Sequence, residues 1–268
     1  MSANEFLSAA CAVAREAGEI LSAGFGSAGQ IEFKGTVDLV TKYDHESEAH
    51  ILGRLRDLYP QHAIRAEESG LAVSREESPF EWLVDPLDGT TNFAHGFPFF
   101  AVSIALLEAG RPIVAAVFDP VRDELFAAIV GASATLNGAP IRVSGTDQLD
   151  RALLATGFPY DVRTHPRNNM TEFNRMALRT QGIRRAGAAA LDLCYTACGR
   201  LDGFWELRLH PWDVAAGGLI VQAAGGKVTD IENGDEWLSG ISVVASNGRV
   251  HTELLATLPA ESDKKSAP

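Results

Sequence analysis

Residues 82–93 read WLVDPLDGTTNF: three apolar residues, then two carboxylates, a glycine and two hydroxyl side chains. The apolar run predicts a buried strand, and Asp85 and Asp88 follow where that strand leaves the core. If the proline between them turns the chain, the carboxylates converge, and two charges about 4 Å apart repel by roughly 4 kcal/mol at an effective dielectric of about 20. A fold rarely keeps such repulsion without a cation. The segment therefore indicates a cation site, with the Leu87 carbonyl as a further oxygen ligand.

Gly89 and the hydroxyl side chains after it suit an anionic ligand. Glycine lets the backbone approach a ligand closely, and the exposed N–H groups of such a turn can hold a phosphate. Taken alone, the same residues also fit an ordinary Asp–Gly turn with an aspartate cap. The positions of acidic residues elsewhere in the chain are needed to distinguish these two interpretations.

Three further segments carry acidic residues at the ends of predicted elements. In AEESG, Glu67 and Glu68 are neighbours at the end of a short strand and point to opposite faces, so one of them faces a shared site. Asp213 stands at the start of a predicted helix, where the helix dipole also favours an acid. The segment KGTVDLVTKYD is typical of an exposed strand that enters a helix capped by Asp44.

The composition excludes several classes of function. The chain has 268 residues, of which 46% are hydrophobic, so it can bury a substantial core. Its net charge of −12 argues against a nucleic-acid-binding surface, and no polybasic run indicates a membrane surface. No apolar run approaches the ~20 residues of a membrane span. Three sparse cysteines fit a reducing cytosol, with Cys194 and Cys198 packed in the core, so we expect a cytoplasmic protein.

The pattern of elements differs between the two halves of the chain. Helices are predicted over 4–23 and 44–58, and strands run from 82 to about 143, with a tight hairpin turn at Asn137-Gly138 and a last strand over 139–144. After about residue 150, strands and helices alternate. The first half is therefore α+β with a largely antiparallel sheet, and the second is α/β.

The boundary between the halves lacks the composition of a flexible linker. We therefore expect one domain over residues 1–262, with halves of about 1–148 and 149–262 packed as a unit. The polar segment 263–268 is predicted to be a disordered tail.

These segments together resemble a known family. DPLDGTTNF with PWDVAAG and AAGG is similar to the two signature segments of the inositol monophosphatase family, within the Mg²⁺-dependent, lithium-sensitive phosphatase superfamily. KGTVDLVTKYD, AEES and GRLDGFWELRLHPWD match the family pattern in the same order, across about residues 5–258. The resemblance implies a layered α-β-α-β-α sandwich of the sugar phosphatase type, and it implies a homodimer.

The resemblance also implies roles for single residues. It implies a Mg²⁺ site in which Asp85 bridges two ions and whose ligands are Glu67, Asp85, Asp88, Asp213 and the carbonyl of Leu87. It implies a catalytic set of Glu67, Thr90 and Asp44, in which Thr90 and Asp44 orient the attacking water. The substrate contacts that it implies are Asp88, Gly89, Thr90, Ala189, Glu206 and Asp213.

Two positions depart from the family pattern, and a third is basic. Ala188 stands where members often carry Ser or Thr, and Arg208 occupies a position that is commonly Gly. Both changes bear on the identity of the leaving alcohol rather than on the metal site. Lys34 matches a basic residue near the site.

The expected reaction is hydrolysis of a small polyol phosphate monoester, namely inositol-1-phosphate to inositol and phosphate. Ligands that are all oxygen, with no Cys or His among them, favour Mg²⁺ over Zn²⁺. We expect direct in-line attack by a metal-activated water, without a phosphoenzyme. The alternatives are another small phosphate (fructose-1,6-bisphosphate, histidinol phosphate or adenosine 3′,5′-bisphosphate), or a regulatory binding protein, for example on a transcription complex, with secondary phosphatase activity.

Overall fold

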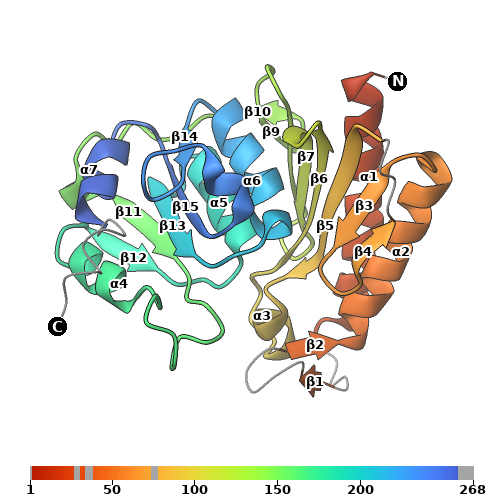
Figure 1. The fold of residues 1–268 in the computed structure, drawn as a ribbon, viewed down its shortest axis with the longest axis horizontal. Helices are drawn as coiled ribbons and strands as arrows, with labels where there is room; N and C mark the ends of the chain where they lie inside the picture. The colour runs from red at the N-terminus through yellow and green to blue at the C-terminus, as the bar shows by residue number, and fades with distance from the viewer. Residues whose placement is uncertain (1, 27–30, 34–38, 74–77, 259–268) are drawn as a thin grey trace.

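The computed structural model describes residues 2–26, 31–33, 39–73 and 78–258. It confirms the expected five-layered α-β-α-β-α arrangement, in which two sheets alternate with three pairs of helices (Figure 1). From one face of the molecule to the other, the helical layers are α1 (Ala3–Gly24) with α2 (Lys42–Leu58), α5 (Ala189–Ala197) with α6 (Pro211–Ala223), and α4 (Met170–Ala177) with α7 (His251–Thr257).

The first sheet has eight strands in the order β10-β9-β8-β7-β6-β5-β3-β4. All neighbouring strands are antiparallel except the parallel pair β3 and β5, which confirms the expected largely antiparallel sheet. The strands are β3 (Ala63–Ala66), β4 (Gly70–Val73), β5 (Phe80–Asp88), β6 (Ala101–Glu108), β7 (Arg111–Asp119), β8 (Glu124–Ile129), β9 (Thr135–Leu136) and β10 (Ala139–Pro140).

The hairpin turn at Asn137-Gly138 is confirmed, since both residues have positive φ between β9 and β10. The predicted strand over 139–144 is wrong beyond Pro140. Proline has no N–H to donate to a ladder, and the backbone N–H of Val143 instead donates to Ala224 O at the end of α6 (3.2 Å).

The second sheet has five strands in the order β12-β11-β13-β15-β14. It is mixed, because β11 runs parallel to β12 and β13 while β15 is antiparallel to both of its neighbours. These strands are β11 (Leu153–Thr156), β12 (Gly182–Arg184), β13 (Gly203–Leu207), β14 (Lys227–Thr229) and β15 (Ser242–Ser246). The remaining elements are the short hairpin β1 (Ile31–Phe33) with β2 (Leu39–Thr41), helix α3 (Thr90–Ala94) and single 3₁₀ turns at Leu149–Arg151 and Glu236–Ser239.

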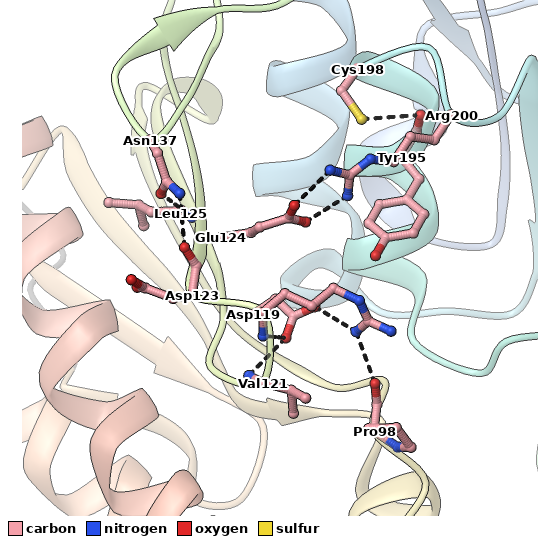
Figure 2. A network of polar contacts seen from close by, with 11 residues as sticks. Pro98, Asp119, Val121, Asp123, Glu124, Leu125, Asn137, Tyr195, Cys198 and Arg200 are labelled. Carbon is pink, nitrogen blue, oxygen red and sulfur yellow. Dashed lines mark hydrogen bonds and ion pairs between the residues drawn. The ribbon is translucent and has the colours of Figure 1, made fainter.

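The middle helical layer packs against both sheets, so one apolar core joins the two halves of the chain. Small residues make this packing possible: a Cβ on Gly217 would lie 2.6 Å from the Leu193 side chain. Polar contacts add to the join (Figure 2). Arg200, after α5, forms a two-pronged ion pair with Glu124 of β8 at 2.5 and 2.6 Å, and its guanidinium lies 4.7 Å over the Tyr195 ring.

Three expectations concern single residues or the ends of the chain. Cys194 is buried and Cys198 packs against the same core, and both are free thiols, as expected. Lys34 and the predicted tail at 263–268 lie outside the described residues. The division into halves at about 148 stays a prediction. Within the part of the chain that the structure describes, none of the helices combines the length and the apolar character that crossing a bilayer requires.

His251, at the start of α7, is a buried titratable group outside the cavity described below. It is 1% exposed, and its ring nitrogens lie 3.0 Å from Thr229 Oγ1 and 2.9 Å from Ser246 Oγ. Burial lowers the pKa of His251 to about 4, and the charge of Lys227 acts in the same direction. The folded protein therefore holds this imidazole neutral where an unfolded chain protonates it.

We predict that stability depends on this histidine at mildly acidic pH. The folded-state pKa lies below the ordinary 6.5, so its contribution is complete above pH 6.5 and is lost as the pH falls toward 4. The full loss is on the order of 3 kcal/mol. Urea unfolding at pH 7.5 and 4.5 measures it, and His251→Gln should flatten the difference while the exposed His45→Gln keeps it. An unchanged difference in His251→Gln contradicts the assignment.

Candidate active site

One cavity is lined by segments from both halves of the chain. Its walls come from the end of β3, the end of β5 with α3, the segment after β11, the start of α5, and the end of β13 with the start of α6. All the predicted site residues except Asp44 line this cavity: Glu67, Asp85, Leu87, Asp88, Gly89, Thr90, Ala189, Glu206 and Asp213. Residues far apart in the sequence are thus brought together.

The end of β5 bends at the point where the acidic residues begin. The pairing of β5 with β6 breaks between Asp85 and Asp88. Asp85 Oδ1 accepts a hydrogen bond from the Leu87 N–H (3.0 Å), and Pro86 O accepts one from Ser47 Oγ of α2 (2.9 Å). The sequence dictates this bend, because proline cannot donate to the ladder and the aspartate forms a local turn in its place.

Burial and mutual repulsion act on the acidic group. Burial raises the pKa of Asp85 well above its usual range, and the charges of Glu67, Asp88 and Asp213 raise it further. The pKa of Asp213 is raised in the same way, first by burial and then by Glu67. Each charged group acting on Asp85 is another carboxylate, so this cavity disfavours full ionisation unless a cation is present.

Asp88 connects the two halves directly. Its carboxylate accepts hydrogen bonds from the backbone N–H groups of Ala189 (3.2 Å) and Ala190 (2.7 Å), in the first turn of α5. The N-cap residue of α5 is Ala188, which has no side-chain oxygen, so Asp88 supplies the missing cap from the other half. Burial raises the pKa of Asp88 to about 6, and these N–H groups oppose that rise.

Thr90, which lines the cavity, is hydrogen-bonded to Asp44, which does not line it. Thr90 Oγ1 lies 3.0 Å from Asp44 Oδ1 and 3.1 Å from Leu87 O, either of which can accept its hydrogen. The prediction that Asp44 caps α2 is wrong. The N-cap is Thr41, and Asp44 completes a capping box two residues inside the helix by accepting from the Thr41 N–H at 2.8 Å. Burial raises the pKa of Asp44.

The acids from the other segments also reach the cavity. Glu67, directly after β3, lines it. Asp213 serves two purposes, because its Oδ2 also accepts from the His210 N–H (2.7 Å) in the capping box of α6. The helix-cap interpretation and the site interpretation of Asp213 are therefore both compatible with its position.

Glu206, on β13, faces the cavity from the second sheet. Burial raises the pKa of Glu206 to about 8, and the positive charge of Arg185 only partly opposes this rise. Both side chains line the cavity, and Ala189 lies there too. The wall from the second sheet thus offers a carboxyl group, a guanidinium and a small apolar surface.

The donors in this cavity suit a hard divalent cation. The acidic group offers hard oxygen ligands, namely the carboxylates of Glu67, Asp85, Asp88 and Asp213 and the Leu87 carbonyl, and His210 also lines the cavity. Within the described residues, no group of three or more Asp, Glu, His or Cys side chains could hold a metal ion in the positions that the structure gives them. The fit therefore rests on donor chemistry and on the repulsion among buried carboxylates that a cation would relieve.

Asn92, in α3, belongs to this region and was missed in the sequence. Its Nδ2 lies 2.7 Å from Phe99 O, 2.8 Å from Ala186 O and 3.3 Å from Gly187 O. One side-chain amide thus ties α3 to the segment that leads into α5. Its place two residues after Thr90 is the only hint in the sequence, and a long-range contact of this kind has no local pattern.

We predict that Asn92→Ala destabilises the protein by about 1 kcal/mol or more, because partly buried carbonyls lose their donor. The start of α5 should also loosen, so that the amides of Ala189 and Ala190 exchange faster. Urea unfolding and hydrogen exchange measure the two effects. Asn168→Ala is the control, because it removes side-chain hydrogen bonds with Val162 O and with the Met170 N–H, neither of which reaches α5. Unchanged exchange in α5 would contradict the role of Asn92.

Comparison with known proteins gives consistent results across the chain. Residues 2–263 match the family described as the inositol monophosphatase family. The chain is 48% identical over 237 residues to the inositol-1-monophosphatase of Synechocystis sp., covering 88% of this chain and 82% of the relative. It is 45% identical over 245 residues to the Nus factor SuhB of Vibrio cholerae, covering 91% of each.

Solved structures agree with these matches. The inositol monophosphatase of Anabaena (Nostoc) sp. PCC 7120 has a TM-score of 0.86 at 43% identity, covering 97% of this chain and 98% of that one. The extragenic suppressor protein suhB of Bartonella henselae has a TM-score of 0.90 at 38% identity, covering 96% and 99%. The chain belongs to the inositol monophosphatase family.

Proposed function

We propose that this protein hydrolyses the phosphate monoester of a small polyol, most specifically inositol-1-phosphate to inositol and phosphate, with Mg²⁺ as cofactor. Membership of the family supports a phosphatase, and the name of the Synechocystis relative supports this substrate. The observation that carries the proposal is the cavity in which Glu67, Asp88 and Asp213 all raise the pKa of Asp85.

We assign the metal ligands to Glu67, Asp85, Asp88, Asp213 and the Leu87 carbonyl. The assignment is supported by an oxygen-only donor set, which Mg²⁺ prefers. Bound Mg²⁺ supplies charge neutralisation at the phosphoryl oxygens and a lower pKa for the attacking water. The carboxylates in turn gain the cation that offsets their repulsion.

Thr90 and Asp44 would orient the attacking water. When Thr90 Oγ1 donates its hydrogen to Asp44 Oδ1 at 3.0 Å, its lone pairs remain free to accept a hydrogen from water. The water oxygen then keeps a lone pair directed at phosphorus. Glu67 completes the catalytic set as a carboxylate at the edge of the same cavity.

The phosphate would lie against Gly89 and Thr90. Gly89 has a φ of +95°, and a Cβ there would lie 3.0 Å from Phe99 O, so only glycine suits this turn. A backbone without a side chain allows close approach of phosphate oxygens to N–H groups. Asp88 and Asp213 border the same position.

The leaving alcohol would lie against Ala189 and Glu206. In either protonation state the carboxyl group of Glu206 keeps an oxygen that accepts a hydrogen bond from a polyol hydroxyl. Since burial raises the pKa of Glu206 to about 8, a hydroxyl partner also offsets part of the cost of burying this group. Ala189 leaves room for the ring.

We propose direct in-line attack by water. Asp85 is the alternative nucleophile, but as a metal ligand its oxygens are occupied, and Oδ1 also accepts from the Leu87 N–H. Rapid quench of the enzyme with labelled substrate distinguishes the two routes. A phosphorylated aspartate that forms and decays at the turnover rate would exclude direct attack.

The substrate proposal is tested by phosphate release across a panel of compounds. We expect the purified protein with Mg²⁺ to prefer inositol-1-phosphate over fructose-1,6-bisphosphate, histidinol phosphate and adenosine 3′,5′-bisphosphate. Removal of divalent cations with a chelator should abolish release, and returning Mg²⁺ should restore it. Preference for another member of the panel would replace the proposed substrate and leave the reaction class in place.

We predict that Asp88→Asn lowers turnover by at least about 100-fold, because a charged ligand at the reacting centre is lost. Asparagine keeps an oxygen for the α5 cap, so circular dichroism should show an intact fold. Calorimetry should show weaker Mg²⁺ binding than in the unaltered protein. The exposed Asp147→Asn serves as the control. Wild-type turnover and Mg²⁺ affinity in Asp88→Asn would remove the metal assignment.

We further propose that the chain is one phosphatase domain ending near residue 262, that it acts in the cytoplasm as a homodimer, and that lithium inhibits it. Light scattering of the purified protein tests whether it is a dimer. Phosphate release in LiCl, compared with NaCl at matched ionic strength, tests lithium inhibition.

A regulatory binding role is the second candidate function. Relatives named Nus factor SuhB, including the 45% identical protein of Vibrio cholerae, favour it. Gene deletion followed by complementation separates the two functions. If the Asp88→Asn variant restores the deletion phenotype as well as the unaltered gene does, the regulatory role is primary.

A further inference from the structure

Arg208 directly follows β13, lines the cavity and has an unusual backbone conformation. Its φ is +66°, a left-handed value that residues other than Gly, Asn and Asp seldom adopt. The backbone is held there by hydrogen bonds from Arg208 N to Ile241 O and from Leu209 N to Gly240 O, both 2.9 Å. The neighbouring Leu207 is buried, whereas Glu206 and Arg208 both line the cavity.

The guanidinium of Arg208 has a specific partner. Its Nη1 lies 2.7 Å from Asp161 Oδ1, and the two side chains are 32% and 41% exposed. Asp161 ends the segment 157–161, which leaves β11. The four residues before Asp161 form one wall of the cavity: Gly157, Phe158, Pro159 and Tyr160.

This wall segment (157–161) is held at both ends. At its start, a Cβ on Gly157 would overlap the Glu206 carboxylate, and Gly157 O accepts a hydrogen bond from Asn169 Nδ2 at 2.6 Å. At its end, the Arg208–Asp161 ion pair ties it to the chain just after β13. Between these two points the backbone is irregular and the Phe158 ring packs against the Phe173 ring at 5.7 Å, so the ion pair is one of the contacts that limit outward movement of the segment.

The position of the wall segment determines which part of a substrate it meets. It lies against Glu206, whose carboxylate a Cβ on Gly157 would meet, whereas a Cβ on Gly89 would meet Phe99, Gly187 and Ala188 instead. Under the proposed function, on which this inference rests, Glu206 faces the leaving alcohol and Gly89 faces the phosphate. The wall segment therefore borders the alcohol and not the reacting phosphorus.

We propose that the Arg208–Asp161 ion pair determines which leaving alcohols the cavity admits. With the pair formed, the wall segment is fixed beside Glu206 and the cavity accepts a compact polyol. A bulkier alcohol requires the wall segment to move outward, which breaks the pair. Arg208 is thus a specificity-determining residue that acts through the wall segment, and its charge is already matched by Asp161 rather than presented to a second anionic group.

The test compares two monoesters that share the reacting group and differ in the alcohol: inositol-1-phosphate and adenosine 2′-monophosphate. The variants are Arg208→Asn, Asp161→Asn and the double variant. Asparagine tolerates positive φ, so Arg208→Asn removes the guanidinium without changing the backbone requirement. Arg163→Asn is the matched control, since Arg163 is exposed in the same loop. The preference is the ratio of the two kcat/KM values, measured with Mg²⁺.

We expect each single variant to lower the preference for inositol-1-phosphate by about fivefold, the upper end for a partly exposed ion pair. The double variant should lower it no further, because both changes break the same pair. Arg163→Asn should leave the preference unchanged. An unchanged preference in the single variants, or effects that multiply in the double variant, would overturn the proposal.

A second measurement does not depend on activity. The amides of Val162, Thr164 and His165 are hydrogen-bonded to Pro159 O and Asp161 O at 2.9–3.0 Å, so a peptide covering 158–165 reports on the wall segment. Its hydrogen exchange should be faster in Arg208→Asn and Asp161→Asn and unchanged in Arg163→Asn. Equal exchange in all four proteins would overturn the proposal whatever the kinetics show.

The two levels of proposal fail differently. If the unaltered protein with Mg²⁺ releases phosphate from neither ester, the proposed function fails, and the assignment of an alcohol side fails with it. If it hydrolyses inositol-1-phosphate normally and the variants keep its preference, only the role of the ion pair fails.

Discussion

The carboxylate of Asp88 ends a strand in one half of the chain and caps a helix in the other. Helix α5 begins at an alanine that offers no capping oxygen, and the N–H groups of its first turn donate to Asp88 instead. This contact fixes the second half against the end of β5, where the cavity lies. Asn92 joins the halves beside this contact, and the Glu124–Arg200 ion pair joins them between β8 and the chain after α5 (Figure 2).

Several acids in this protein serve the fold and the cavity with different oxygens. Asp44 accepts from the backbone of Thr41 with Oδ2 and from Thr90 with Oδ1. Asp213 uses Oδ2 in the capping box of α6, and its pKa is raised by burial and by the charge of Glu67 in the cavity. Because the helix termini hold these side chains, little conformational entropy remains to be lost when a ligand binds. The secondary structure thus holds these carboxylates in place before any ligand binds.

The elements with strong local patterns could be predicted from the sequence. The first helix, expected over 4–23, spans Ala3–Gly24, and the Asn137-Gly138 turn is where it was predicted. The acidic residues that line the cavity could be predicted to share a site, because each follows a recognisable strand or lies at the start of a helix. Their roles as ligands and catalysts stay predictions.

What the sequence could not supply depends on contacts between distant residues. Asn92 is positioned by three carbonyls, two of them in the other half. The strand expected over 139–144 ends at Pro140, because the following backbone pairs with the end of α6. Asp44 proved to be the third residue of α2, where it completes a capping box with the N-cap Thr41, a distinction that depends on which side chain reaches which N–H.

The shared middle layer has a consequence for synthesis of the chain on the ribosome. The eight-stranded sheet is complete by Pro140, yet the helices that cover its inner face, α5 and α6, begin only at Ala189 and Pro211. For the time needed to translate those further residues, apolar side chains such as Phe126 and Val117 have no cover. The nascent first half therefore exposes an apolar surface that is prone to aggregate. Chaperones that bind such surfaces can act on the chain during this interval.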